Sequence, residues 1–174
     1  MLFVDRVVNV VEKGIDVAIR IGFLRDSSLV AVKIGEVRRV VCASTQYLRR
    51  NGAAATPQEL QAHRCVRHTG LSPRSEWRFR FGRRKVTIPI NCAMISNEID
   101  SAITACVNGM GIGMFLSYQT APHRKANKIR YILEEFELEP VPVQVVYPHT
   151  RRLSTTVRSF VDDCVANLRD VKLD

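Results

Sequence analysis

The pattern of apolar and polar residues predicts a β-hairpin near the middle of the chain. From Glu76 to Phe81 the residues alternate, with aromatic side chains on one side and arginines on the other. Gly82 and two arginines then lead into a second run at 85–90. Because alternation with period two is typical of a half-buried strand, these runs predict two paired strands with a basic outer face.

Four helices are predicted where a capping residue precedes apolar positions at helical spacing. They begin at Asp5, Thr56, Asn97 and Ser154. The helix at Thr56 has proline at its first position and a glutamate that can reach back to the cap. The helix at Asn97 is expected to end at Gly109 or Gly111, and the helix at Ser154 has the clearest apolar stripe. The glycines of 109–113 close a helix and open a strand, so they predict helix termination and close packing, not a phosphate loop.

Further apolar runs predict strands between these helices. The run 15–21 is interpreted as a mostly buried strand ending at Gly22, and a strand pair is expected near 29–34 and 38–43. The run 112–116 predicts another strand. Strands that alternate with helices favour an α/β fold with a parallel or mixed sheet.

Length and composition are those of a soluble globular protein. The 174 residues suffice for one large domain or two small lobes, and 46% of them are hydrophobic. The sequence has neither a secretory signal nor an apolar run long enough to span a membrane, so a cytoplasmic protein is expected. Five scattered cysteines are typical of buried residues in a reducing compartment.

The formal net charge of +9 raises the hypothesis of nucleic-acid binding. The basic residues are spread along the chain in short pairs and along the hairpin. A solvated basic surface is therefore the favoured interpretation, and direct contact with nucleic acid remains an alternative.

The sequence offers no motif for catalysis, a metal or a cofactor. His63, Cys65 and His68 lack a fourth ligand at zinc-site spacing, and no serine or cysteine stands in a nucleophile motif. Predicted helix starts and strand ends instead favour a ligand-binding cleft, because orphan N–H groups at helix starts attract anions. We therefore expect a binding protein, not an enzyme, with no catalytic residue, metal site or cofactor.

Several motifs in order resemble the effector-binding domain of LysR-type transcriptional regulators. The segment 5–22 is similar to the family's "D-R-x-V-D-L-V-x-E-G-x-D-V-A-I-R-I-G", and 41–48 resembles its "C-A-S-P-x-Y-L". The helix start at Thr56, the segment from Asn97 to Gly113 and the C-terminal segments 145–154 and 157–161 also fit.

This resemblance implies a two-lobed α/β fold like that of type II periplasmic binding proteins, with an effector bound between the lobes. It implies that lobe I comprises residues 1–44 and 144–174 and that lobe II comprises 45–143. Relative to the family, the DNA-binding winged helix-turn-helix is absent and lobe I is incomplete at its N-terminus, where only Leu2 to Val4 would remain of the second strand. An unpaired strand edge and a tendency to aggregate are expected.

The resemblance also implies effector-binding residues by position. In lobe I and at the hinge they are Arg20, Ile21, Gly22 and Ser44, and in lobe II they are Thr69, Gly70, Asn97 and Phe115. A carboxylate effector is favoured if Arg20 faces the cleft, and a salt-bridged structural role for Arg20 is the alternative.

The implied partners are an effector, further copies of the chain in a dimer or tetramer, and DNA only through the missing N-terminal domain. No membrane partner is expected. A solute-binding protein of the same fold without a regulatory role is the other alternative.

Overall fold

The structure, a computed structural model, describes residues 15–24, 29–149 and 154–168. The chain forms two compact units. Unit 1 contains residues 1–37 and 140–174, and unit 2 contains residues 38–139. The expected boundaries at residues 44 and 143 differ from these. Residue 44 ends the strand 39–44 of unit 2, and residue 143 lies inside the strand 141–148 of unit 1. The predicted helix at Asp5 and the strand remnant at Leu2 lie outside the described residues.

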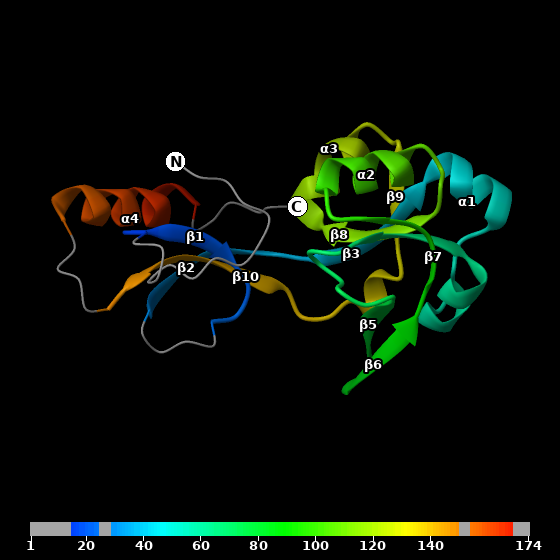
Figure 1. Ribbon diagram of the computed structural model, residues 1–174, viewed down its shortest axis with the longest axis horizontal. Coiled ribbons are helices and arrows are strands. Elements are labelled where there is room, and N and C mark those ends of the chain that lie inside the picture. Colours follow the sequence, from blue (N-terminus) through cyan, green and yellow to red (C-terminus); the bar gives the residue numbers. More distant parts are fainter. Residues whose placement is uncertain (1–14, 25–28, 150–153, 169–174) are drawn as a thin grey trace. The chain divides into compact units, whose positions relative to one another are not determined.

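Unit 1 is built on a three-stranded antiparallel sheet with the order β1-β10-β2 (Figure 1). The strands are β1 (Ala18–Ile21), β2 (Leu29–Val37) and β10 (Val141–Pro148). Helix α4 (Thr155–Leu168) contacts β2. The predicted cap of α4 is confirmed, since the Ser154 hydroxyl accepts a hydrogen bond of 3.3 Å from the Val157 N–H. Of its predicted apolar stripe, Val161 and Cys164 are buried and Phe160 is exposed.

The prediction that β1 is mostly buried is wrong. The side chain of Ile19 is 51% exposed and that of Ile21 is 36% exposed. In the described sheet β1 lies at an edge, and its only strand partner there is β10. Both faces of an apolar strand are buried only when another structural element covers each face. The residues of the strand do not specify that element.

Unit 2 is built on a five-stranded mixed sheet with the order β7-β4-β8-β3-β9. Its strands are β3 (Arg39–Ser44), β4 (Arg64–His68), β7 (Asn91–Ser96), β8 (Ile112–Leu116) and β9 (Ile129–Ile132). Strand β4 runs parallel to β7 and β8, and β3 runs antiparallel to β8 and β9. The expected mixed sheet is therefore confirmed. The expected pair of β2 and β3 is not, because each strand bonds within the sheet of its own unit.

Short helices connect the strands of unit 2. They are α1 (Thr45–Asn51), η1 (Pro57–Ala62), α2 (Ile99–Val107), α3 (Ser117–Lys125) and η2 (Glu134–Phe136). The predicted helix start at Thr56 is confirmed, although the helix is of the 3₁₀ type. The Glu59 carboxylate accepts hydrogen bonds from the Thr56 hydroxyl and from the Ala55 N–H, at 3.0 and 2.9 Å.

The core of unit 2 lies on both faces of its sheet. Helices α2 and α3 cover one face, and the hairpin of β5 (Glu76–Phe81) and β6 (Arg84–Pro89) lies on the other (Figure 1). Trp77 and Phe79 are buried on the hairpin side, and Ile103 and Cys106 are buried beneath α2. The predicted hairpin is thus confirmed, including its exposed arginines.

The glycine-rich segment 109–113 ends one element and packs closely against another. Gly109 follows α2 with a φ of +82°, a left-handed conformation that favours glycine. A Cβ atom on Gly111 would lie 2.4 Å from the carbonyl oxygen of Arg64, so no other residue fits there without a shift of backbone. The prediction of helix termination with close packing is confirmed.

Candidate functional site

The carboxyl ends of β4 and β7 bring three of the predicted site residues together. The two strands are parallel and pair His68 with Ser96, and the Thr69 N–H donates a 2.9 Å hydrogen bond to the Ser96 carbonyl. This bond holds the loop that starts at Thr69 and Gly70 beside Asn97. We call residues 69, 70 and 96–98 the β4–β7 edge. Its polar groups lie where parallel strands of α/β proteins usually meet their ligands.

Glu98, not Asn97, caps helix α2, so the predicted cap is wrong by one residue. The two carboxylate oxygens of Glu98 accept hydrogen bonds from the backbone N–H groups of Asp100 and Ser101, at 3.2 and 2.6 Å. These bonds lower the pKa of Glu98, the Ser101 N–H contributing most. The sequence favours Asn97 because asparagine is a common cap and glutamate is not. A glutamate is nevertheless long enough to bond the N–H groups of its own first turn.

The cap changes the electrostatics of this edge. Helix N-termini attract anions through N–H groups that lack a partner within the helix. In α2 the Glu98 carboxylate already occupies two of those groups. An external anion would therefore have to displace a carboxylate that belongs to the chain itself.

Arg38 and Glu137 join the two places where the chain passes between the units. Arg38 is the first residue of unit 2, and Glu137 precedes its last residue by two positions. The Arg38 guanidinium donates from Nε and Nη2 to the two carboxylate oxygens of Glu137, each bond being 2.9 Å long. A third bond, of 2.7 Å, goes to Glu134. No sequence motif pointed to this cluster, because its residues lie about a hundred positions apart.

Arg39 begins β3, opposite Leu116 at the end of β8. Since β8 runs parallel to β4, Arg39 lies at the same end of the sheet as the β4–β7 edge. Its Nε atom is buried without a hydrogen-bond partner in the described part of the chain. Burial, and then the neighbouring Arg78 guanidinium, lower the pKa of Arg39.

Ser44 and Phe115 do not join the β4–β7 edge. Ser44 is the last residue of β3. Because β3 runs antiparallel to β8, Ser44 lies at the opposite end of the sheet. It is buried, and its hydroxyl caps α1 by accepting a 3.1 Å hydrogen bond from the Tyr47 N–H. The Phe115 side chain is fully buried in the core beside α2. Ser44 is therefore not at either crossing between the units, since these lie at residues 37–38 and 139–140.

The predicted residues of unit 1 follow one another along β1. Arg20 and Ile21 pair with Gln144 and Val143 of β10, and the Gly22 N–H extends this ladder with a 2.9 Å bond to the Pro142 carbonyl. Arg20 is half-buried, and none of the described carboxylates forms an ion pair with it. The structural salt bridge that was its alternative role is therefore not found within the described residues.

The histidines and cysteines considered as metal ligands have other contacts. His63 Nδ1 lies 3.1 Å from the Tyr47 hydroxyl, and the buried Cys65 thiol has its pKa raised to about 12, mainly by burial. Among the residues that the structure describes, no three His, Cys, Asp or Glu side chains gather as metal ligands would. Within the same residues, no helix is both long and apolar enough to cross a bilayer.

Comparisons of sequence identify relatives among bacterial transcriptional regulators. Residues 2–169 match the family described as LysR substrate binding domain. An HTH-type transcriptional repressor of Pseudomonas aeruginosa is 33% identical over 160 residues, which are 91% of this chain and 50% of the repressor. The regulator PtxR of the same species is 29% identical over 167 residues, covering 93% of this chain and 52% of PtxR. The chain thus spans about half the length of the curated relatives it matches.

Solved structures of LysR-type regulators have the same fold. The full-length virulence activator AphB of Vibrio cholerae superposes with a TM-score of 0.77 and 25% identity, over 88% of this chain and 52% of AphB. Full-length CrgA of Neisseria meningitidis gives a TM-score of 0.77 and 25% identity over 92% of this chain and 54% of CrgA. The type II periplasmic-binding-protein-like fold of such regulatory domains is therefore the fold of this chain. With the family matched over residues 2–169, the chain belongs to the LysR substrate-binding domains.

Proposed function

We propose that this chain is the effector-sensing part of a LysR-type transcriptional regulator, and that it has no catalytic activity. It binds a small molecule and shifts the population of two conformations, which changes how DNA-binding domains elsewhere in the regulator engage a promoter. The family match and the names of the relatives support this role. We further propose that the whole regulator is a cytoplasmic oligomer that contacts DNA outside these 174 residues.

The observation that carries the proposal is the hydrogen bond from the Thr69 N–H to the Ser96 carbonyl. It holds Thr69, Gly70 and Asn97 together at the carboxyl ends of two parallel strands. A hydroxyl, an exposed glycine backbone and a side-chain amide provide donors and acceptors for a small polar ligand. We propose these three residues as the effector contacts of unit 2.

A carboxylate effector needs a positively charged partner. The N-terminus of α2 does not provide one, because two of its N–H groups already donate hydrogen bonds to the Glu98 carboxylate. Arg20 is the proposed partner for a carboxylate, since its guanidinium can bond both oxygens and it has no ion pair with the described carboxylates. Ile21 and Gly22 beside it remain proposed contacts of unit 1. Ser44 and Phe115 are not kept, because one caps α1 and the other is fully buried.

Calorimetric titration of the chain with small aromatic and aliphatic carboxylic acids tests the proposal. For an acid that binds, T69A and N97A are expected to weaken binding about fivefold to tenfold, the loss that follows from removing one hydrogen bond. R20A removes a charge-assisted contact and is expected to weaken it by more than tenfold. T87A, which changes an exposed threonine of strand β6, is the matched control. Unchanged affinity in T69A and N97A would remove the β4–β7 edge from the site.

The exposed basic face of the hairpin supports nucleic-acid binding as a second candidate. Arg78 and Lys85 are exposed there, and Arg80, paired with Lys85 in register, bonds Glu139 at 3.0 Å. If this face bound duplex DNA, the affinity would fall steeply as the salt concentration rises, and R78Q/K85Q would reduce that salt dependence by about two phosphate contacts. No binding at moderate salt would leave the charge as a solvated surface.

A further inference from the structure

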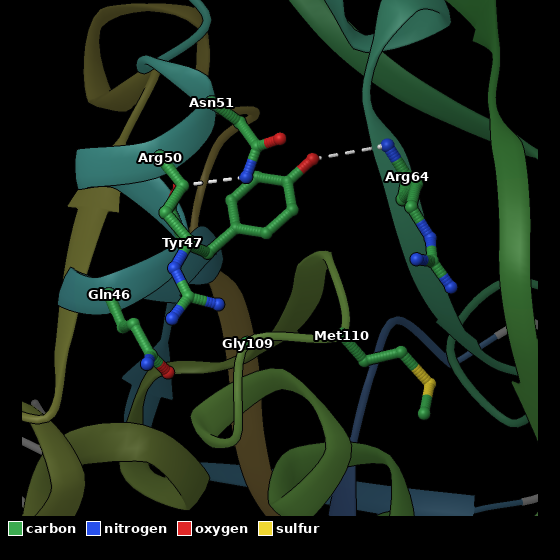
Figure 2. A pocket seen from close by; sticks show the side chains of 7 residues that line it. All are labelled: Gln46, Tyr47, Arg50, Asn51, Arg64, Gly109 and Met110. Atoms are coloured by element: carbon green, nitrogen blue, oxygen red, sulfur yellow. Dashed lines mark hydrogen bonds between the residues drawn. The ribbon is translucent and has the colours of Figure 1, made fainter.

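Unit 2 has a pocket at the end of its sheet away from the β4–β7 edge. Its volume is about 250 Å³, and the residues around it are Gln46, Tyr47, Arg50, Asn51, Arg64, Gly109 and Met110 (Figure 2). Arg64 is the first residue of β4, whereas the β4–β7 edge follows its last residue. The two places are therefore separated by the length of a strand.

Three elements build the walls of this pocket. Gln46 and Arg50 lie four residues apart on α1, a spacing that puts both on one face of the helix. Arg64 comes from β4, and Met110 follows the turn that ends α2. Figure 2 shows Arg64 on the side of the pocket opposite α1, with Gly109 and Met110 between them.

Tyr47 fixes these elements to one another. Its hydroxyl accepts a 3.2 Å hydrogen bond from the Arg64 N–H and lies 3.1 Å from His63 Nδ1. Its backbone carbonyl accepts a 3.0 Å bond from the Asn51 amide. The Asn51 bond lies within α1, whereas the two contacts of the buried Tyr47 side chain would break if α1 moved away from β4. The pocket is therefore built into the fold and does not arise from a loose surface loop.

The charge of the pocket is positive. Its lining contains two guanidinium groups and no carboxylate. Neither Arg50 nor Arg64 forms an ion pair with the carboxylates that the structure describes. Both arginines are exposed, and an anion that enters the pocket is attracted by the two charges together. Guanidinium groups suit oxyanions, because two of their N–H groups can bond two oxygens of one carboxylate or phosphate.

We propose that this pocket binds a small oxyanion, a carboxylate or a phosphate, at a second site separate from the proposed effector contacts. Arg50 and Arg64 hold the charge, and the side-chain amide of Gln46 contributes a further donor. The Met110 thioether forms a wall of the pocket and fits the apolar part of an organic anion. A volume of about 250 Å³ restricts the ligand to a small molecule.

Titration of the full chain with inorganic phosphate and, separately, with citrate tests this site by nuclear magnetic resonance at low ionic strength. Saturating shifts of the backbone amides of Asn51, Gly109 and Met110 are expected, and those of Thr69 and Asn97 should stay in place. The two titrations show whether phosphate or carboxylate is preferred. If neither anion gives saturating shifts, the proposal is wrong.

Matched variants separate the pocket from general attraction to a basic protein. R50Q and R64Q should each weaken binding about tenfold or more, and the double variant should lose it. R49Q removes an equal charge from the neighbouring position of α1, outside the pocket, and should bind as the parent does. M110E keeps both arginines but adds a carboxylate to the pocket, so it should also lose binding. Equal weakening in R49Q and R50Q, or unchanged binding in the double variant, would overturn the proposal.

The remaining amide signals report the fold of each variant in the same experiment. Anion binding in this pocket does not depend on the β4–β7 edge. Loss of anion binding in R50Q or R64Q leaves the proposed effector contacts intact, and T69A should not change the titration with phosphate.

Discussion

The Arg38 guanidinium bonds both carboxylate oxygens of Glu137, at 2.9 Å each. The two side chains are only 26% and 12% exposed. They lie where the chain enters unit 2 and where it is about to leave it, so one ion pair ties together both connections to unit 1. A movement that separates Arg38 from Glu137 would break both hydrogen bonds.

Removal of this ion pair should destabilise unit 2. In a double-mutant cycle with R38M and E137Q we expect a coupling free energy of about 1–2 kcal/mol, above the usual range for surface pairs because the groups are mostly shielded from water. Urea unfolding of the four proteins measures it. The exposed pair of Lys33 and Glu36, at 2.8 Å, is the control and should give less than about 0.5 kcal/mol. Equal coupling in both cycles would contradict the prediction.

The Glu98 cap should make stability depend on acid pH. Its pKa is lower in the folded protein than the ordinary value of 4.5, so the folded state favours the ionised carboxylate. The stabilisation is therefore fully present above pH 4.5 and is lost as the pH falls through the lower folded pKa. E98Q should lower the thermal midpoint near neutral pH and approach the parent protein below that pKa. E135Q, on an exposed carboxylate, serves as the control, and a parallel pH profile of E98Q and parent would contradict the cap.

The thiols should differ in reactivity. Burial raises the pKa of Cys65 to about 12, and the hydrogen bond to Cys106, together with burial, raises that of Cys42. Since thiolates are the reactive form, these thiols should react with a disulfide reagent only on unfolding. Cys92 is partly exposed and should react first. A stopped-flow measurement should show a fast phase that C92S loses, and its persistence in that variant would contradict the assignment.

Phe115 should behave as a core residue and not as an effector contact. Its side chain is completely buried with Ile103 and Cys106. F115A is expected to lower the free energy of unfolding by about 3–5 kcal/mol, and F115L by less, because leucine leaves a smaller cavity. Urea unfolding measures both. A stable F115A variant with weakened effector binding would instead return Phe115 to the site.

The apolar side chains of β1 and the residues after it should promote self-association. Ile19 is 51% and Phe23 is 67% exposed, and both lie in unit 1. Apolar groups exposed beside an edge strand favour contact with other chains. I19S/F23S should therefore shift the mass measured by light scattering toward the monomer. Y118S, on the exposed Tyr118 of helix α3 in unit 2, is the control and should have little effect, because this residue does not lie on an edge strand. No shift in I19S/F23S would exclude this surface from association.

The local sequence determined the elements whose signal lies within a few residues. The alternation of Trp77 and Phe79 with arginines gave a correct hairpin, and Ser154 was correctly identified as a cap, because period and capping are local properties of the backbone. The order of motifs along the whole chain was sufficient to indicate the family. The parallel pairing that brings Thr69 beside Asn97 was consistent with the predicted α/β pattern.

The tertiary structure decided what depends on distant residues. The direction of β3 placed Ser44 at the end of the sheet away from Thr69, and a strand's direction depends on its partners and not on its own residues. The exposure of Ile19 depends on what covers the sheet, and the bond between Arg38 and Glu137 joins residues far apart in the chain. The pair of arginines at 50 and 64 likewise shares a pocket only because Tyr47 fixes α1 to β4. Period and capping are set by neighbours in sequence, whereas burial, ion pairs and pockets are set by neighbours in space.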